Sequence, residues 1–375
     1  MARDFIRSLP EHERDAGASW LRSIHIDPLL MLLLVLVIGY GLVVLYSAVD
    51  QSQTLFQAQL VRISLAVVAL VIAAQLPPQI YVRWAPFIYV FGIALLVLVL
   101  TVGVKVKGSQ RWLDIPGIVR FQPSELMKIA VPMAVAWYFH DRPLPPSFKD
   151  VCVALAIVAI PAGCIIAQPD LGTGILVAVA GFAVVVLAGL PWRWMLYAGL
   201  ALATAAPGLW FTLQDYQRQR IVTLFDPESD PLGAGWNIIQ STTAIGSGGL
   251  LGKGLFAGTQ SHLDFLPEAR TDFIIAVVGE ELGFVGVTVL LGLYLLVIMR
   301  GMFIAVSAES TFGRLLSGAL ILTFFVYVFV NIAMVAGLLP VVGVPLPLVS
   351  YGGTSAITLM ASFGILMAIR THKAW

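Results

Sequence analysis

Long stretches without a charged side chain alternate with short polar segments along most of this chain. A helix that crosses a bilayer needs about 20 predominantly apolar residues. Eight segments before residue 300 meet or approach this length: 28–49, 57–76, 81–104, 123–139, 151–168, 172–190, 194–213 and 272–299. The pattern therefore predicts a set of membrane-spanning helices.

The C-terminal region 315–369 carries no charge and is too long for a single spanning helix. Its Gly- and Pro-rich part, 337–353 (GLLPVVGVPLPLVSYGG), is of the kind that interrupts helices, so we place it between a ninth and a tenth span. The chain is thus predicted to be an all-α integral membrane protein, a polytopic bundle of about ten transmembrane helices. Residues 28–375 form its one membrane domain.

Two polar segments flank or interrupt the spans. Residues 1–27 are polar for too long to be a cleavable signal peptide, so they are predicted to be a cytoplasmic N-terminal tail. Residues 214–271 are predicted to be a long extracytoplasmic loop between helices seven and eight, flexible and partly embedded in the membrane.

Composition agrees with a membrane protein and excludes several other classes. Hydrophobic residues make up 59% of the chain and charged residues 11%, whereas soluble domains carry about 25% charged residues. Cys152 and Cys164 lie in an apolar run without metal-ligand spacing, and the five histidines form no metal motif. The glycine-rich segment 244–254 lacks the order of a nucleotide-binding loop, since Gly254 follows Lys253. A net charge of +1 gives no indication of nucleic-acid binding.

Basic residues usually concentrate in cytoplasmic loops. With ten spans and a cytoplasmic N-terminus, every predicted inner segment carries at least one Lys or Arg. Two predicted outer segments break this rule, because 105–120 and 214–271 hold four cations each. Long loops escape the rule, which is one explanation; the other is that these cations meet an anion at the outer face.

Glu125 and Lys128 lie three residues apart on the fourth predicted span, so they share one helix face. They are either a structural ion pair or part of a phosphate site, in which Lys128 and Arg111 hold the phosphate and Glu125 positions them. Arg offers a planar fork of donors where Lys offers a point charge, and a pyrophosphate needs several donors. Spacing alone leaves both interpretations open.

Asp170 lies in the turn 168–173 (QPDLGT) between the fifth and sixth spans, at the outer face. An Asp followed by small residues at a helix start is an ordinary N-cap. If the turn faces a cavity, the carboxylate would instead contact a cation or a sugar hydroxyl.

Asp272 is the strongest candidate for an acid with a chemical role. It lies in the stretch 258–283 (GTQSHLDFLPEARTDFIIAVVGEELG), where a polar loop enters an apolar segment. Ionisable groups at membrane depth generally face a wet cavity, a partner charge or a substrate. A general base needs an ionised carboxylate close to a hydroxyl, and neighbouring Arg270 favours the ionised form. The alternative is that Asp272 only caps the helix.

Glu280 and Glu281 follow on the same predicted helix. At 100° per residue they lie about 80° and about 180° round the helix from Asp272. They are therefore interpreted as helix-packing or cation-holding groups rather than as a second catalytic acid.

Four stretches resemble the SEDS family, the proteins of shape, elongation, division and sporulation. They are GSQRWLDIPGIVRFQPSELMK (108–128), QPDLGT (168–173), LPEARTDFIIAVVGEELG (266–283) and NIAMVAGLLPVVGVPLPLVSYGGTS (331–355). The resemblance covers essentially the whole chain in order, and the stretch 258–273 is closer to the family's elongation member than to its division member.

The resemblance implies a peptidoglycan glycosyltransferase that polymerises lipid II, a disaccharide-pentapeptide on undecaprenyl pyrophosphate. The enzyme would act at the outer face of the bacterial cytoplasmic membrane, with both chain termini in the cytoplasm. The family's essential acid corresponds to Asp272, its ion pair to Glu125 and Lys128, and its cavity arginine to Arg111. Asp272 would take the proton of the acceptor 4-hydroxyl, and inversion at the donor C1 would give a β-1,4 strand.

The departing pyrophosphate would be stabilised by cations of the site, with Arg218 or Arg220 joining Arg111 and Lys128. Residues expected to support the site are Gln122, Ser124, Asp170, Lys253, Glu280 and Ser350. A divalent cation, Mg²⁺ or Mn²⁺, could share the charge-stabilising role, although no ligand cluster in the sequence indicates one. The resemblance also implies a class B penicillin-binding protein as the partner, together with other membrane proteins of the elongasome.

Two other functions remain to be weighed against polymerisation. A transporter that flips lipid II would also use broken helices and buried charges, but near the midplane and open to both sides. Here the candidate residues cluster by predicted topology at the outer mouth, which favours the polymerase. A scaffold that only recruits wall enzymes would tolerate the loss of Asp272.

Overall fold

The computed structural model describes residues 24–106, 109–115, 119–230, 233–259 and 268–372. Residues 1–23 of the predicted tail 1–27, Lys107 and residues 260–267 of the candidate stretch lie outside the described residues.

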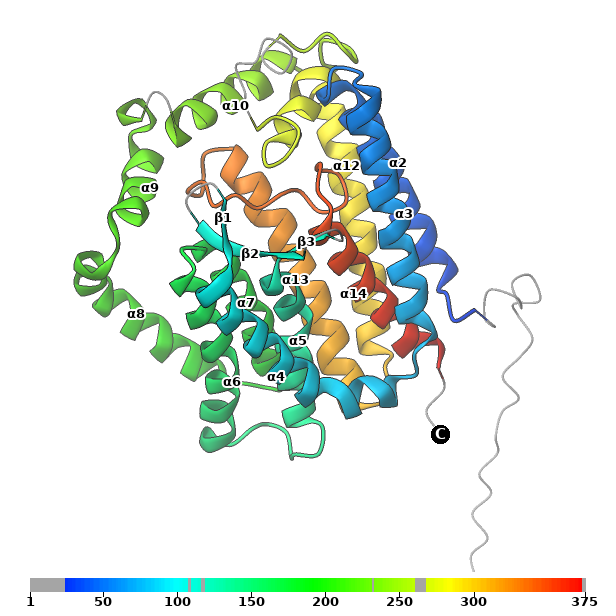
Figure 1. Ribbon diagram of the computed structural model, residues 1–375, viewed down its shortest axis with the longest axis vertical. Helices are drawn as coiled ribbons and strands as arrows, with labels where there is room; N and C mark the ends of the chain where they lie inside the picture. The colour runs from blue at the N-terminus through cyan, green and yellow to red at the C-terminus, as the bar shows by residue number, and fades with distance from the viewer. Residues whose placement is uncertain (1–23, 107–108, 116–118, 231–232, 260–267, 373–375) are drawn as a thin grey trace, which may run out of the picture.

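The described chain is dominated by long helices packed side by side (Figure 1). These are α2 (Pro28–Ala48), α3 (Gln53–Gln75), α4 (Pro78–Val102), α5 (Pro123–Phe139), α6 (Phe148–Ala167), α7 (Leu171–Leu187), α8 (Trp192–Thr212), α12 (Ile274–Val306), α13 (Thr311–Val335) and α14 (Thr354–Thr371). Each overlaps one of the predicted spans. Seven of them are long and apolar enough to cross a membrane among the described residues, and α7 is a shorter apolar helix. The multi-pass helical fold is confirmed, while a count of ten membrane crossings stays a prediction.

Helix starts follow local sequence signals. Asp27 caps α2 by accepting a hydrogen bond from the Leu30 amide at 2.9 Å, with Pro28 in the first helical position. Ser147 and Asp150 form a reciprocal capping box at the start of α6. Both signals can be recognised in the sequence, which explains why the helix starts lie close to their predicted positions.

The helical fold class is confirmed, but one segment of the described chain forms strands instead of helices. Between α4 and α5 lies a small antiparallel sheet in the order β1-β2-β3, formed by β1 (Val104–Val106), β2 (Ser109–Ile115) and β3 (Val119–Phe121). Apolar and polar residues alternate at the start of this segment, in VKVKGSQ, and alternation is typical of strands rather than helices.

The predicted loop 214–271 also contains regular structure. It holds α9 (Asp215–Phe225), the 3-10 turn η1 (Pro227–Ser229) and α10 (Ala234–Gly248). The end of α10 packs on α12, where a Cβ at Gly248 would lie 1.9 Å from the Gly279 carbonyl oxygen. The residues that follow α10 form backbone hydrogen bonds with α12 on both sides of its kink at Gly283, whose φ is 64°.

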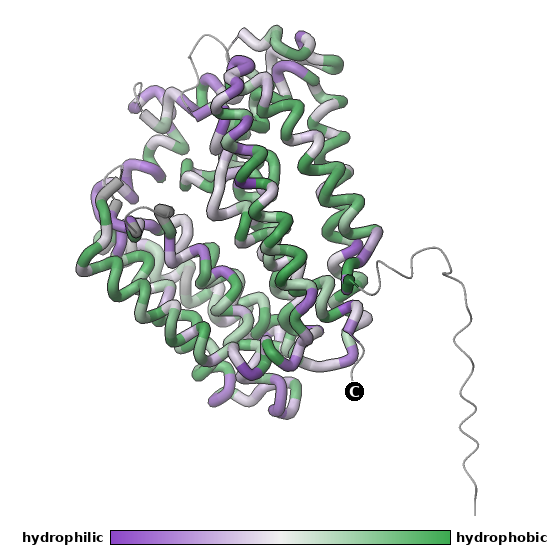
Figure 2. Tube along the Cα trace, turned by 45° about the vertical axis from the view of Figure 1, so that its right-hand side comes forward, coloured by the Kyte–Doolittle hydropathy of each residue, from purple (hydrophilic) through white to green (hydrophobic). Residues whose placement is uncertain are grey.

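Helix α5 lies in the middle of the bundle and is almost entirely buried, in contact with α4, α6, α7, α13 and α14. Outer helices expose apolar side chains instead: Figure 2 shows hydrophobic residues along their outward faces, and Leu32 of α2 and Phe87 of α4 are exposed. Such surfaces suit a lipid environment. Helix α8 has at most slight contact with the other described elements, and in Figure 1 it stands apart from the bundle with α9.

Candidate functional site

A cavity of about 580 Å³ opens at the end of the bundle where α5, α7 and α12 begin. Strand β2, helix α13 and the segment 342–355 complete its walls. Its polar lining includes Arg111, Gln122, Glu125, Lys128, Asp170, Arg220, Glu268, Thr271, Asp272 and Tyr327. The fold thus brings seven of the predicted site residues, which lie between positions 111 and 272 of the sequence, to one cavity.

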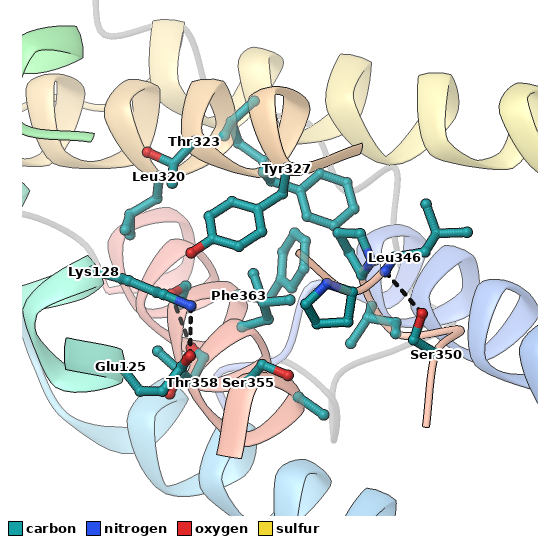
Figure 3. A pocket seen from close by; sticks show the side chains of 18 of the residues that line it. Glu125, Lys128, Leu320, Thr323, Tyr327, Leu346, Ser350, Ser355, Thr358 and Phe363 are labelled. Atoms are coloured by element: carbon teal, nitrogen blue, oxygen red, sulfur yellow. Dashed lines mark hydrogen bonds and ion pairs between the residues drawn. The ribbon is translucent and has the colours of Figure 1, made fainter. Parts of the chain in front are cut away.

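Glu125 and Lys128 form the predicted ion pair within the first two turns of α5. The Lys128 Nζ donates to Glu125 Oε1 at 2.6 Å, and both side chains are nearly buried, at 11% and 7% exposure. Lys128 also lies 4.8 Å from the ring centroid of Tyr327, a cation–π contact with α13 (Figure 3). The pair is therefore held from two helices and presents Lys128 at the cavity wall.

A narrow side pocket of about 30 Å³ runs from this pair between α13 and α14 (Figure 3). The hydroxyls of Thr323, Ser355 and Thr358 line it among apolar side chains. The space is large enough for one or two waters, which would give the buried charges additional hydrogen-bond partners.

Asp170 combines the two roles that the sequence left open. Its Oδ1 accepts from the Thr173 amide at 3.4 Å and so caps α7. Its Oδ2 accepts from Gln122 Nε2 at 3.2 Å and lies 3.4 Å from Arg111 Nη1. Asp170 therefore orients the Arg111 guanidinium, which stays 29% exposed towards the cavity.

Asp272 lies in the turn that precedes α12, with its side chain partly exposed to the cavity. Phe273 occupies the N-cap position of α12, one residue after Asp272. Gly343 faces it closely: a Cβ there would lie 3.5 Å from Asp272 Oδ2, and the glycine has a φ of 74°. The choice between a catalytic acid and a helix cap at Asp272 stays a prediction.

Three successive carbonyl groups hold this turn against the C-terminal part of the chain. The Tyr351 amide donates to the Arg270 carbonyl at 2.8 Å, and Ser350 Oγ donates to the Thr271 carbonyl at 2.5 Å. Asn331 Nδ2 donates to the Asp272 carbonyl at 2.7 Å and also lies 2.7 Å from the Val344 carbonyl. The backbone of Asp272 is thus positioned by α13 and by the segment 343–351.

Two residues of α3 brace that same segment and were not singled out from the sequence. Gln59 is buried, lies 3.4 Å from the Ser350 carbonyl and accepts from the Gly352 amide at 3.3 Å. Arg62 places its guanidinium 4.4 Å from the centroid of the Tyr351 ring. The available signal in the sequence was that Arg62 is a lone arginine in an apolar span, and this signal does not indicate that its partner is Tyr351.

Other predicted residues lie outside the cavity lining. Arg218 donates to the carbonyls of Trp210 and Phe211 at 3.1 and 2.8 Å, whereas Arg220 reaches the lining. Ser350 supports the Asp272 turn as described, and Ser124 is buried at the start of α5.

Glu280 and Lys253 form a separate cluster on the far side of the Asp272 turn. Glu280 is fully buried, and its Oε1 accepts from Lys253 Nζ at 2.7 Å and from the Thr259 amide at 2.7 Å. Neighbouring Glu281 accepts from Ser47 Oγ at 2.6 Å. Glu280 thus holds the Lys253 cation and Glu281 contacts Ser47, in line with their interpretation as cation-holding and packing groups, while any role in the reaction stays a prediction.

The arrangement of acidic, His and Cys side chains decides whether the cavity has a site for a metal ion. Within the described part of the chain, no three His, Cys, Asp or Glu side chains converge on one point. The cavity acids Glu125 and Asp170 instead pair with Lys128 and Arg111. The residues present do not form a preassembled site for the divalent cation considered from the sequence, so no chemical step is assigned to one.

Comparison with known proteins gives consistent matches over nearly the whole chain. Residues 27–374 match the FtsW/RodA/SpoVE family model, described as a cell cycle protein. The chain is 54% identical over 352 residues to the peptidoglycan glycosyltransferase MrdB of Escherichia coli K12, covering 94% of this chain and 95% of the relative. It is 36% identical over 360 residues to the probable peptidoglycan glycosyltransferase FtsW of Trichlorobacter lovleyi, covering 92% of each.

Solved structures agree. A chain from a peptidoglycan synthase complex that coordinates polymerization and crosslinking superposes with a TM-score of 0.81 at 32% identity, over 91% of this chain and 96% of that one. The rod shape determining protein RodA of Thermus thermophilus superposes with a TM-score of 0.69 at 29% identity, over 91% and 95%.

Proposed function

Since the chain belongs to the SEDS family, matching its FtsW/RodA/SpoVE model over residues 27–374, we propose that it joins lipid II units into the glycan strands of peptidoglycan. It is a peptidoglycan glycosyltransferase, like the MrdB relative to which it is 54% identical. Likeness to MrdB and to a rod shape determining protein supports a role in cell elongation.

The observation that carries the mechanism is that Asp272 shares one cavity with three cations. Asp272 lies in the same lining as Arg111, Lys128 and Arg220. Glycosyl transfer from a pyrophosphate donor needs these two functions, a base for the acceptor hydroxyl and positive charge for the leaving group.

Asp272 is the proposed general base. Its carboxylate takes the proton from the 4-hydroxyl of the acceptor N-acetylglucosamine as that oxygen bonds to C1 of the donor muramic sugar. The bond from C1 to the pyrophosphate oxygen breaks on the opposite face, so the α-linked donor becomes a β-linked unit. Hydrogen bonds to the carbonyls of residues 270–272 keep the carboxylate in place during this step.

Arg111, Lys128 and Arg220 are the proposed partners of the departing undecaprenyl pyrophosphate. Arg111 provides two or more donors in a plane, and Asp170 with Gln122 orients it. Glu125 holds the Lys128 ammonium at the wall and neutralises it before substrate arrives, which limits the cost of burying that charge.

Helix α8 has at most slight contact with the other described elements and stands apart from the bundle in Figure 1. We propose that the polyprenyl chain of the substrate enters there, because its apolar length can stay in lipid while the pyrophosphate reaches the cations. In this arrangement the cavity faces the extracytoplasmic side of the cytoplasmic membrane, and both chain termini are cytoplasmic.

The proposed partner is a class B penicillin-binding protein that crosslinks the strands. Support comes from the similar chain in a synthase complex that couples polymerization to crosslinking. Other elongasome membrane proteins are proposed as further partners.

A transporter of lipid II is less well supported. The polar residues of the cavity lie near one end of their helices: Asp170 caps α7, Asp272 precedes α12 and Glu125 is in the first turn of α5. A flippase needs a substrate path that opens to both sides.

The test is polymerisation of labelled lipid II by the purified protein with its penicillin-binding partner. We expect Asp272→Asn, which keeps the shape and removes the base, to lower strand synthesis by at least about 100-fold, the contribution typical of a general base. Asp215→Asn is the matched control, since Asp215 is fully exposed on α9 and outside the cavity lining.

Equal synthesis by wild type and Asp272→Asn would remove Asp272 from the mechanism. Transfer of lipid II across vesicles without strand synthesis would favour the transporter instead.

A further inference from the structure

A second hollow lies at the other end of the bundle and plays no part in the proposed reaction. It is a groove of about 570 Å³ where α7 and α12 end and α13 begins. Its floor is made of small buried residues, Ala188, Ala305 and Gly318, while Leu187 and Val306 form exposed apolar walls. Small side chains on three neighbouring elements leave the space that larger ones would fill.

The groove lies far from the cavity on the same three helices. Helix α7 starts at the Asp170 cap and reaches the groove with Leu187, and α12 starts next to Asp272 and reaches it with Val306. Beyond its kink at Gly283, residues 284–306 of α12 alone are about 35 Å long, which exceeds the roughly 30 Å hydrocarbon core of a bilayer. The groove therefore lies at the opposite membrane surface from the cavity.

One cation lines this otherwise apolar groove. Arg314 is in the first turns of α13 and is exposed. Two other arginines at this end have acidic partners: Arg142 pairs with Asp150 at 2.7 Å and Arg300 with Asp27 at 2.6 Å. Within the described ranges, Arg314 makes no ion pair.

We propose that this groove binds an anionic phospholipid of the leaflet opposite the catalytic cavity. Its phosphate lies at Arg314, and one acyl chain runs along the floor of small residues towards the bilayer centre. The occupant needs a negative head and an apolar body together, because a cation stands at the polar end of an apolar channel. A phospholipid has this chemistry and is present at this depth, and basic sites between membrane helices are a recurring way to hold its headgroup.

Aromatic side chains around the groove agree with this depth. The turn that lines it at Gly189 leads into Trp192, which is 67% exposed, and Phe148 packs against Trp194 at a ring distance of 5.1 Å. Exposed Trp residues are typical of the interface between headgroups and acyl chains.

The test is native mass spectrometry of the purified full-length chain with added phosphatidylglycerol or phosphatidylcholine. We expect wild type to retain phosphatidylglycerol preferentially and Arg314→Gln to weaken that binding about fivefold, the weight of one cation at an anionic surface. Arg314→Lys should retain most of the preference. Arg83→Gln is the matched control, an exposed arginine at the start of α4 that does not line the groove.

A second variant tests whether the apolar floor of the groove holds an acyl chain. Ala305→Leu fills the floor, so we expect it to lower retention of phosphatidylglycerol while Arg314 remains. Lipid II polymerisation by the same sample reports whether the bundle is intact.

The proposal is overturned if Arg314→Gln and Arg83→Gln weaken binding equally, because diffuse surface charge would then account for it. Equal retention of phosphatidylcholine, or displacement of the lipid by inorganic phosphate alone, would also overturn it.

Discussion

The buried ion pair of Glu125 and Lys128 depends on both of its members. Removal of one partner leaves the other ionised in a nearly closed site. We expect Glu125→Gln to lower the free energy of unfolding by about 3–5 kcal/mol, measured by chemical unfolding in detergent.

The paired variant Glu125→Gln with Lys128→Met is the control for that prediction. It should regain much of the stability, since no isolated charge remains, but it should not regain polymerisation. A paired variant as unstable as the single one would contradict this account.

Asn331 is expected to act as a positioning residue for Asp272. Asn331→Ala leaves the carbonyls of Asp272 and Val344 without its amide, each at a cost of about 1–3 kcal/mol where no water replaces it. We expect strand synthesis to fall at least tenfold with lipid II binding retained. Ser317→Ala, which removes another buried hydrogen bond of α13, is the control and should leave synthesis near normal. A similar loss in both variants would point to general destabilisation.

For single residues, the sequence indicated candidates with a chemical role better than it indicated the residues that position them. Asp272, Glu125 and Lys128 stand out because charge is costly in an apolar segment. The supporting residues Tyr327, Gln59 and Asn331 do not stand out in the sequence, since an uncharged polar side chain in an apolar span has many possible roles. Gln59 contacts Ser350 across 291 positions, and nothing local in either segment indicates that contact.

Among the elements, the packing of α10 on α12 depends on two glycines that allow close approach. A Cβ at Gly248 would lie 1.9 Å from a backbone oxygen of Gly279, which cannot move aside like a side chain. We expect Gly248→Ala to destabilise the protein by at least about 1–3 kcal/mol, measured as a lower unfolding midpoint.

Gly246→Ala is the matched control on the same helix. No atom lies within 4 Å of a Cβ there, so the change should be neutral or slightly stabilising. Equal unfolding midpoints for the two variants would show that α10 does not dock as closely as described.

Apolar length was sufficient to place the long helices, but not the regular structure between them. The strands β1–β3 and the helices α9 and α10 lie in polar segments where hydrophobic periodicity is weak. The kink at Gly283 was also missed, because a glycine within an apolar helix does not by itself indicate a positive φ.

For the molecule as a whole, the two ends of the described chain meet at a pair of histidines. The rings of His25 and His372 stack with centroids 3.7 Å apart. Burial, together with the neighbouring His372, lowers the pKa of His25 below its usual value near 6.5.

The lowered pKa of His25 makes the stability of the folded state depend on pH. Above pH 6.5 the ring is neutral in both the folded and the unfolded chain, and the contact is kept. As the pH falls below 6.5, the unfolded chain binds a proton that the folded chain resists, so the folded state loses stability. We expect the unfolding midpoint to fall between pH 7 and pH 5, and His25→Leu to reduce this dependence. His140→Leu should not, and a fall unaffected by His25→Leu would assign the effect to other groups.

The hydrogen bonds from residues 331–351 to the Asp272 turn also bear on how the enzyme is made. A ribosome exposes Asp272 well before it has synthesised the residues that hold it, so a nascent chain inserted only as far as α12 carries the acid without its supports. Activity can therefore arise only after the last two helices have entered the membrane. We expect a chain that stops after residue 330 to be inactive even where it inserts, which would keep unfinished copies from extending the cell wall.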